Sequence, residues 1–439
     1  MNQIFVDFSK ITGTIKPMHA VNNGPVKSNL EAFREAGIPC CRNHDAAFSV
    51  SYGGSHAHDV LNIFPDFDAD ENDPANYDFT LTDVTVRDIY ASGSTMMYRL
   101  GSKIEHEIKK YQTFPPKDFA KYARICEHII LHYCYGWADG MQMPIKYWEI
   151  WNEADNYAPV TGHNPCWQGT HAQFCEFYEV MAKYLKGRFP ELKIGGPAYT
   201  GGHWDLTEEF LCYAQAHEIP IDFFSWHCYC TEPSQMGESI RRSKSLLVKY
   251  GYGNVETVLD EWNYVRAWSG PDKAYSYRCI QNEKGLAFNA ANMLAAQKSP
   301  LDMLMYYDAR MSTAWNGLFA AYSAVVLKPY YAFWQFGRLY QLKNEAASES
   351  DEDCLYVGAA VDGGEGAVQI AYYSDAPQEA RTVEVTLAGL SGKNRIEIRL
   401  SDKEHDNDVI QTLTTNGTEL TLSLCLQQYS SVLISACVE

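Results

Sequence analysis

The chain has 439 residues, of which 46% are hydrophobic and 21% are charged, so its length suits two to three domains or one large barrel with an accessory unit. Its net charge of −19 argues against binding to nucleic acid or to an anionic membrane, because both need a basic surface. Aromatic residues reach 13%, which suits a large core first and ring platforms for sugars second.

The N-terminal residues MNQIFVDFSK lack a basic segment followed by an apolar one, and no run approaches the roughly 18 apolar residues of a membrane span. The 13 cysteines are an odd number and show neither CxxC pairs nor metal-ligand spacing. We therefore expect reduced, mostly buried thiols in a cytoplasmic protein. Disulfides in a secreted protein are the alternative.

From about residue 15 to about residue 345, strand-like segments alternate with helical ones. The expected strands span residues 13–21, 38–45, 94–101, 145–153, 192–199, 221–229, 255–263 and 300–310. The expected helices span residues 26–37, 85–93, 116–136, 171–190, 206–218, 239–253, 285–299 and 329–342. Alternation of this kind implies parallel pairing, and eight such units predict a (β/α)8 TIM barrel over residues 13–345 in an α/β protein.

The pattern changes after residue 345. The segment NEAASESDED, residues 344–353, reads as a polar, acidic connector. Short alternating strands follow, separated by turn pairs such as Gly363–Gly364 and Asn416–Gly417. They predict an accessory C-terminal β-sandwich over residues 346–439, joined by the N-terminal strand within residues 1–12.

A TIM barrel keeps its active site at the carboxyl ends of its strands. The polar residues expected there are Arg42, Asn43 and His44 on the second strand, Asn152 and Glu153 on the fourth, His227 and Tyr229 on the sixth, Asp260 and Glu261 on the seventh, and Asp308, Arg310 and Trp315 after the eighth.

Glu153 and Glu261 are separated by 261 − 153 = 108 residues, which is about three βα units and places them across the barrel mouth from each other. Glycoside hydrolysis needs two carboxyl groups that flank the scissile bond. Two other acids compete with Glu261. Glu256 lies at the start of its strand, on the stability face of a barrel, and strand alternation directs Asp260 to the face opposite Glu261.

The segments WEIWNEAD and VLDEWN resemble the fourth- and seventh-strand signatures of the (β/α)8 clan of retaining glycosidases. Within that clan the chain resembles glycoside hydrolase family 39, the β-xylosidase and α-L-iduronidase family. The segments CCRNHD, FFSWHCY and KPYYAFWQFGRL and the C-terminal sandwich add to the likeness, which covers nearly the whole chain. One departure is Ala154, where many clan members have proline after the acid/base.

The resemblance implies that Glu153 is the general acid/base and Glu261 the nucleophile of a double displacement. It also implies that Asn152 binds the 2-hydroxyl of the sugar, that Tyr229 holds the nucleophile, and that His227 and Arg42 shape the pocket floor. We expect His44 and Trp315 to contact substrate as well, Trp315 as a ring platform because it follows the last strand.

We therefore predict a retaining exo-glycosidase, most closely β-xylosidase-like, that acts on plant-type oligosaccharides or glycosides and needs no cofactor. Alternatives are an α-L-arabinofuranosidase, a galactosidase or another exo-glycosidase on the same scaffold, and, in a different class, a non-catalytic sugar-binding protein. A third alternative is a metal-dependent hydrolase built on His56 and His58, but this pair follows the second strand in a glycine-rich loop, so we expect no metal. The expected partners are a carbohydrate substrate and, in a homo-oligomer, further copies of this chain.

Overall fold

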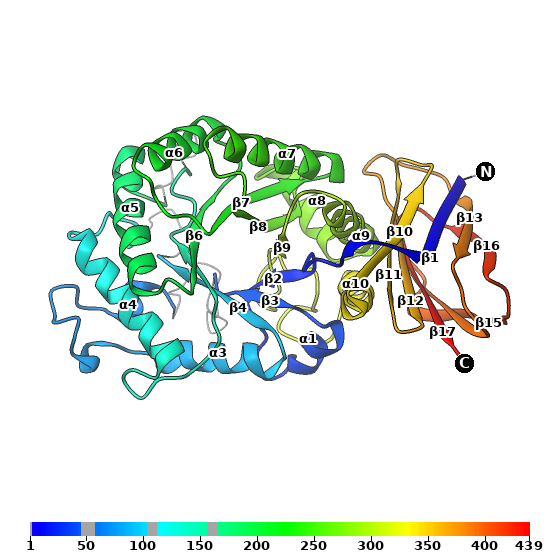
Figure 1. The fold of residues 1–439 in the computed structure, drawn as a ribbon, viewed down its shortest axis with the longest axis horizontal. Helices are drawn as coiled ribbons and strands as arrows, with labels where there is room; N and C mark the ends of the chain where they lie inside the picture. Colours follow the sequence, from blue (N-terminus) through cyan, green and yellow to red (C-terminus); the bar gives the residue numbers. More distant parts are fainter. Residues whose placement is uncertain (1, 45–57, 103–111, 157–165) are drawn as a thin grey trace.

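The structure is a computed structural model that describes residues 2–44, 58–102, 112–156 and 166–439. Eight strands form a closed parallel barrel in the order in which they occur along the chain (Figure 1). They are β2 (Ala20–Asn22), β3 (Cys40–Arg42), β4 (Thr95–Leu100), β5 (Tyr147–Ile150), β6 (Lys193–Tyr199), β7 (Phe223–Cys230), β8 (Glu256–Tyr264) and β9 (Met303–Tyr306).

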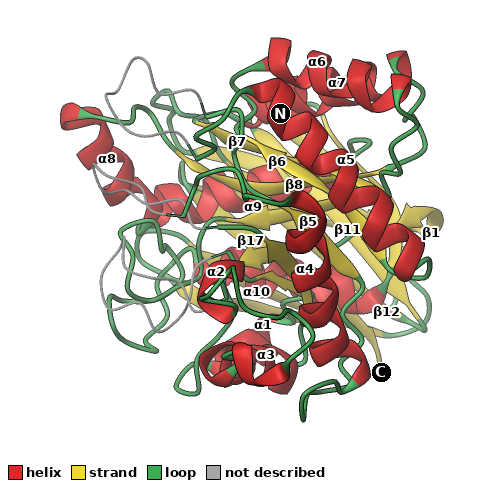
Figure 2. Cartoon of the chain, turned by 90° about the vertical axis from the view of Figure 1, so that its left-hand side faces the viewer, coloured by secondary structure: helices red, strands yellow, loops and turns green. Residues whose placement is uncertain are grey.

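Helices cover the outside of the barrel, as the view turned by 90° also shows (Figure 2). The helices of the described residues are α1 (Leu30–Ala36), α2 (Val60–Ile63), η1 (Pro74–Asn76), α3 (Thr80–Ala91), α4 (Phe119–Tyr135), α5 (His171–Arg188), α6 (Trp204–Ala216), α7 (Pro233–Lys249), α8 (Gly270–Ile280), α9 (Glu283–Gln297) and α10 (Tyr330–Leu342). The predicted (β/α)8 barrel is confirmed.

Helix α4 illustrates how the sequence forms these elements. The side chain of Asp118 caps its start by accepting a hydrogen bond from the backbone N–H of Lys121. Ile125 and Ile129, four residues apart, are buried on one face. The helix ends at Gly136, whose left-handed φ of 78° suits glycine.

The barrel interior has an apolar floor. A cluster of buried side chains fills it, namely Ala20, Cys40, Met97, Phe223, Val258, Met303 and Met305. Closer to the carboxyl ends of the strands, the interior residues are polar: Arg42, Glu149, Ser225 and Asp260 are all buried there. A charged layer therefore lies between the apolar floor and the barrel mouth.

Strand β8 contains a bulge that changes which side chains face this interior. Trp226 of β7 lies opposite Leu259, but the next residue, His227, lies opposite Glu261, so Asp260 is an extra residue on β8. Both Asp260 and Glu261 point into the barrel, where both contact Arg42. The prediction that Asp260 faces away from Glu261 is therefore wrong, because the bulge breaks the two-residue alternation.

The accessory unit is one nine-stranded sheet with the order β15-β14-β17-β12-β11-β10-β1-β13-β16. Side chains from all parts of the sheet meet in a second core, so the sheet folds over itself as the predicted sandwich. Its strands are β1 (Asn2–Thr14), β10 (Asn344–Ser350), β11 (Leu355–Asp362), β12 (Glu365–Tyr372), β13 (Arg381–Ala388), β14 (Asn394–Ser401), β15 (Asp406–Thr415), β16 (Glu419–Leu426) and β17 (Ser430–Val438).

Strand β10 corrects the prediction of a polar connector after the barrel. It pairs with β1 and with β11, both antiparallel. Only Ala346 is buried in it, so the strand has no hydrophobic alternation that a sequence pattern can detect. Strand β1 also pairs in parallel with β13. The division of the chain into domains at residues 13 and 345 stays a prediction.

Helices α9 and α10 lie between the barrel and the sheet (Figure 1), where they contact β11 and β12. Asp375, which follows β12, makes polar contacts that join the accessory sheet to the barrel. Its carboxylate lies 2.6 Å from Nζ of Lys284 on α9 and accepts a hydrogen bond of 2.7 Å from the hydroxyl of Tyr264 at the end of β8. This side of the sheet is therefore fixed to the barrel by both apolar and charged contacts.

All 13 cysteines lie within the described residues, and no two of them are joined by a disulfide bond. Across those same residues, no helix combines the length and the apolar character needed to cross a lipid bilayer.

Candidate active site

The candidate site lies at the carboxyl ends of the barrel strands, where the sequence predicted it. The structure brings seven of the eight predicted residues together there: Arg42, His44, Asn152, Glu153, His227, Tyr229 and Glu261. Trp315, the eighth, lies at the edge of this group.

Glu153 follows β5 in a strained backbone conformation with a φ of 48°, a region that non-glycine residues seldom adopt outside functional sites. Its backbone N–H donates to the carbonyl of Ala198, which fixes the loop beside β6. Its two carboxylate oxygens have different partners. Oε1 lies 2.8 Å from Nδ1 of His227, and Oε2 accepts a hydrogen bond of 2.9 Å from Nδ2 of Asn156.

Glu261 on β8 is held at both oxygens. Oε1 accepts a hydrogen bond of 2.8 Å from Nη1 of Arg42, and Oε2 accepts one of 2.7 Å from the hydroxyl of Tyr229. Burial raises the pKa of Glu261, the charges of His227 and Arg42 lower it, Glu153 and Asp260 raise it, and the balance is a raised pKa. The two donors orient the carboxylate and favour its charged form against the cost of burial.

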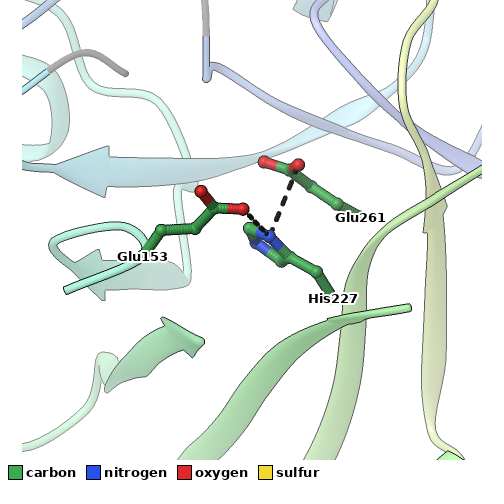
Figure 3. Close-up of side chains that lie close together, drawn as sticks. All are labelled: Glu153, His227 and Glu261. Carbon is green, nitrogen blue, oxygen red and sulfur yellow. Dashed lines mark hydrogen bonds and ion pairs between the residues drawn. The ribbon is translucent and has the colours of Figure 1, made fainter. Parts of the chain in front are cut away.

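His227 lies between the two glutamates (Figure 3). Its Nδ1 is 2.8 Å from Oε1 of Glu153 and 3.5 Å from Oε2 of Glu261. Burial opposes the charged imidazolium, but the carboxylates of Glu261 and Asp260 outweigh it and raise the pKa of His227 well above its usual value. One oxygen of Glu153 and one of Glu261 lie within 4.8 Å of each other around this ring.

Arg42, at the end of β3, connects the site to the layer beneath it. Besides Glu261, its guanidinium donates to Oε2 of Glu149 across 2.6 Å, to Oδ1 of Asn22 across 3.0 Å, and to Oδ1 of Asn152. These bonds use the fixed fork of the guanidinium to set the positions of neighbouring side chains. Within the described part of the chain, Nδ2 of Asn152 has no hydrogen-bond acceptor, so this amide donor is available to a ligand.

His44 and Trp315 lie beside this group. Nε2 of His44 is 3.7 Å from Oε1 of Glu261, so His44 is close to the predicted nucleophile. The Trp315 ring is 6.4 Å from Tyr229 but only 3% exposed, which leaves little ring surface for a sugar. The neighbouring Trp268 is 56% exposed and contacts Tyr229 edge to face, so it offers the more accessible ring.

Two residues of the site, Glu149 and Asn156, were missed from the sequence, and Asp260 was expected at its strand end but on the opposite face. Glu149 and Asp260 contact Arg42 from below, and Asn156 contacts Glu153. A signal for Glu149 exists, because a lone carboxylate stands between Trp148 and Ile150 in an otherwise apolar strand. Asn156 had no such signal, since it lies in a loop whose conformation the sequence pattern does not predict.

Glu153, His227 and Glu261 are, among the described residues, one set of side chains spaced closely enough to hold a metal ion. The electrostatics oppose this use, because Arg42 already neutralises Glu261 and the raised pKa of His227 favours a protonated ring that cannot act as a ligand. His58 is buried, whereas His56 lies outside the described residues, so the proposed pair of histidines is not tested.

A cavity of about 330 Å³ opens beside His227 and Tyr229, the residues that contact Glu153 and Glu261. His227 and Tyr229 form its inner end, and it extends over the start of α7 towards the β6–α6 loop. Two tryptophans, Trp204 and Trp268, and the charged side chains of Glu238 and Arg242 line its outer part. The guanidinium of Arg242 lies over the Trp204 ring at 4.9 Å. The arrangement suits a polar molecule with ring faces.

The family model described as "Glycosyl hydrolases family 39" matches residues 91–267, a segment that contains both glutamates. A β-xylosidase of Geobacillus stearothermophilus is 30% identical over 125 residues, which make up 27% of this chain and 22% of that protein. The chain thus spans about a fifth of the length of this curated relative.

Solved structures share the whole fold. A glucosidase from Croceicoccus marinus has a TM-score of 0.82 at 22% identity, covering 100% of this chain and 99% of that one. A monomeric β-xylosidase from Caulobacter crescentus CB15 has a TM-score of 0.74 at 16% identity and covers 100% of both chains. Together with the matched segment and the motifs within it, these findings confirm the resemblance to glycoside hydrolase family 39 seen in the sequence, and residues 91–267 carry it.

Proposed function

We propose that this protein is a retaining exo-glycoside hydrolase of β-xylosidase type that acts on plant-type oligosaccharides or glycosides. The observation that carries the proposal is the approach of a Glu153 oxygen to within 4.8 Å of a Glu261 oxygen at the barrel mouth. Retaining glycosidases hold their two carboxyl groups about 5–5.5 Å apart, whereas inverting enzymes need roughly 6.5–9.5 Å to admit a water molecule.

In the first step of the proposed reaction, Glu261 attacks the anomeric carbon while Glu153 gives its proton to the leaving oxygen. Arg42 and Tyr229 hold the Glu261 carboxylate, so the attacking oxygen has a defined direction. The bond to the leaving group breaks as the bond to Glu261 forms, and a covalent glycosyl-enzyme results.

In the second step, the Glu153 carboxylate takes a proton from water, and the water oxygen attacks the same carbon. This releases the sugar and returns Glu261 to its charged form. His227, in contact with both glutamates, orients Glu153 for each role. The free amide donor of Asn152 is placed to bind the 2-hydroxyl of the sugar.

The cavity beside His227 and Tyr229 is proposed to hold the leaving group. Its lining residue His227 lies 2.8 Å from Glu153, the group that protonates the leaving oxygen, and its exposed Trp268 ring offers a stacking surface. The proposed cytoplasmic location and homo-oligomer stay predictions.

A screen of aryl glycosides tests the proposal, with Glu261→Gln as the inactive control for each substrate. We expect the largest kcat/KM on the aryl β-xyloside. A preference for the α-L-arabinofuranoside or a galactoside would keep the mechanism and change the sugar. Binding of sugars without hydrolysis of any aryl glycoside would support the sugar-binding alternative and overturn the proposal.

A further inference from the structure

Two buried carboxyl groups lie beneath the candidate site and belong to neither glutamate role. Glu149 comes from β5 and Asp260 from the bulge of β8, and both are fully buried. Both approach the same atom, because Nε of Arg42 is 2.6 Å from Oε2 of Glu149 and 3.3 Å from Oδ2 of Asp260. Two carboxylates cannot share one buried cation at such distances without strong repulsion.

The hydrogen bonds around the two groups are unequal. Oε1 of Glu149 accepts a hydrogen bond of 2.7 Å from Ser225, and Oε2 accepts the one from Arg42. Within the described ranges, neither oxygen of Asp260 accepts a hydrogen bond of good geometry, and Nε2 of His227 is 3.6 Å away. A buried acceptor without a donor is costly, and a proton on Glu149, which is within hydrogen-bonding reach of Asp260, would supply the donor.

The balance of charges in the site also favours a proton on one of these buried carboxyl groups. Four carboxyl groups, those of Glu149, Glu153, Asp260 and Glu261, surround two cationic side chains, Arg42 and His227. The other charged or titratable neighbours include His44 beyond β3, Tyr229 on β7 and Arg99 on β4, which is paired with Asp59. They also include Asp155 beyond β5, a buried carboxyl group whose pKa burial raises to about 7. None of these supplies a further positive charge to balance the layer. With Glu153 protonated as the general acid, three carboxylates still face two cations, so a second carboxyl proton is favoured.

We propose that Glu149 and Asp260 are positioning residues that share one proton between their carboxyl groups and thereby hold Arg42 against Glu261. With that proton in place, Asp260 is the charged member and Glu149 the donor. Burial, together with the charge of Asp260, raises the pKa of Glu149 to about 8, although the charge of Arg42 and the hydrogen bond from Ser225 lower it. Burial also opposes the charge of Asp260, but Arg42 and His227 outweigh it, and the pKa of Asp260 is lowered.

The pair gives the site a charge that changes with pH. When Glu149 loses its proton, near pH 8, a second full negative charge faces Nε of Arg42 and competes with Glu261 for the guanidinium. Arg42 is then drawn away from the nucleophile. The resulting loss of kcat/KM is the same for substrates with good and with poor leaving groups. This catalytic consequence rests on the proposed function, whereas the shared proton does not.

Infrared spectroscopy of the full-length protein at varied pH tests the shared proton directly. A protonated buried carboxyl group has a C=O stretching band that its carboxylate lacks. We expect the wild type to show such a band that disappears near pH 8 and is lost in both Glu149→Gln and Asp260→Asn. Glu256→Gln, at the opposite end of β8, is the matched control and keeps the band, because Glu256 pairs with Lys193.

The pH dependence of kcat/KM on an activated aryl glycoside tests the positioning role. Glutamine at position 149 stays neutral at every pH, so we expect the alkaline fall of kcat/KM to move to higher pH in Glu149→Gln and to stay in place in Glu256→Gln. The protonated carboxyl groups of Glu153 and Asp155 keep bands of their own, so only a band that titrates near pH 8 and persists in Glu149→Gln overturns the shared proton. A band that is lost while the alkaline fall stays in place overturns the positioning role. If no aryl glycoside is hydrolysed, the proposed function fails, and the infrared band still decides the shared proton.

Discussion

The hydroxyl of Tyr229 donates a hydrogen bond of 2.7 Å to Oε2 of Glu261, from a strand next to the one that carries the glutamate. The bond stabilises the charged form of Glu261, and hydrogen bonds to charged groups contribute about 1.5–3 kcal/mol. Tyr229→Phe is therefore expected to lower kcat/KM by about one to two orders of magnitude.

The same substitution has a predicted pH signature. Removing a donor to the carboxylate raises the pKa of Glu261 further, so the acidic limb of the kcat/KM profile moves to higher pH. Tyr250→Phe is the matched control, because Tyr250 also donates to a glutamate, Glu208, far from the site. An acidic limb that does not move in Tyr229→Phe would show that this hydrogen bond does not tune the nucleophile.

Glu153→Ala is expected to affect substrates unequally. A poor leaving group needs a proton from Glu153, whereas an activated aryl group does not, so kcat should fall by about 10²–10⁴-fold on the former and far less on the latter. Added azide should restore part of the turnover by replacing the water that Glu153 activates. An equal loss on all substrates, without rescue by azide, would contradict the assignment.

Asp375 is expected to matter for stability and not for chemistry. It pairs with Lys284, which is almost fully buried, so Asp375→Ala leaves a buried charge without its partner, a change that costs about 3–5 kcal/mol. Thermal unfolding should show a clearly lower midpoint. Asp68→Ala is the control, because its pair with Lys117 is exposed and such pairs contribute about 0–1 kcal/mol. Equal midpoints in the two variants would contradict this role.

The contribution of Asp375 should depend on pH. Burial opposes its charge, but Lys284 and Tyr264 outweigh this, so the folded-state pKa is lowered below 3.8. A depressed carboxyl pKa gives stability that is present above the unfolded value and is lost as the pH falls through the folded one. The difference in thermal unfolding midpoint between the wild type and Asp375→Ala should therefore shrink as the pH falls through the folded-state pKa of Asp375.

The parts of the fold that the sequence predicted are those with a strong period. Strands buried on both faces alternate with helices from β2 to α10, and this alternation alone indicates a closed parallel barrel. Because such a barrel has one functional end, the positions of Glu153 and Glu261 at the ends of their strands were enough to place them together.

The errors have physical reasons. Asp260 was assigned to the outer face because a strict two-residue period was assumed, and a bulge of one residue leaves no mark in the sequence. Strand β10 was missed because its side chains are mostly polar and half-exposed, so hydrogen bonds to β1 and β11 define it, and not hydrophobic burial. The pairing with β1 joins residues that are about 330 positions apart in the chain, such as Thr14 and Asn344, and no local pattern reports it.

The stereochemical outcome is the sharpest prediction from the site. Each glutamate extends a long side chain inward from its strand, and their oxygens approach to within 4.8 Å around His227. Too little room remains between them for a sugar ring and an attacking water in line, so the nucleophile must be Glu261 itself. The first-formed product should keep the anomeric configuration of the substrate, which proton NMR of the early reaction detects. A 2-fluoro-sugar inactivator should label Glu261, and Glu261→Gln should prevent labelling, whereas Glu256→Gln should not. If the first product has the opposite anomeric configuration, or if mass spectrometry finds the label on another residue, double displacement through Glu261 is wrong.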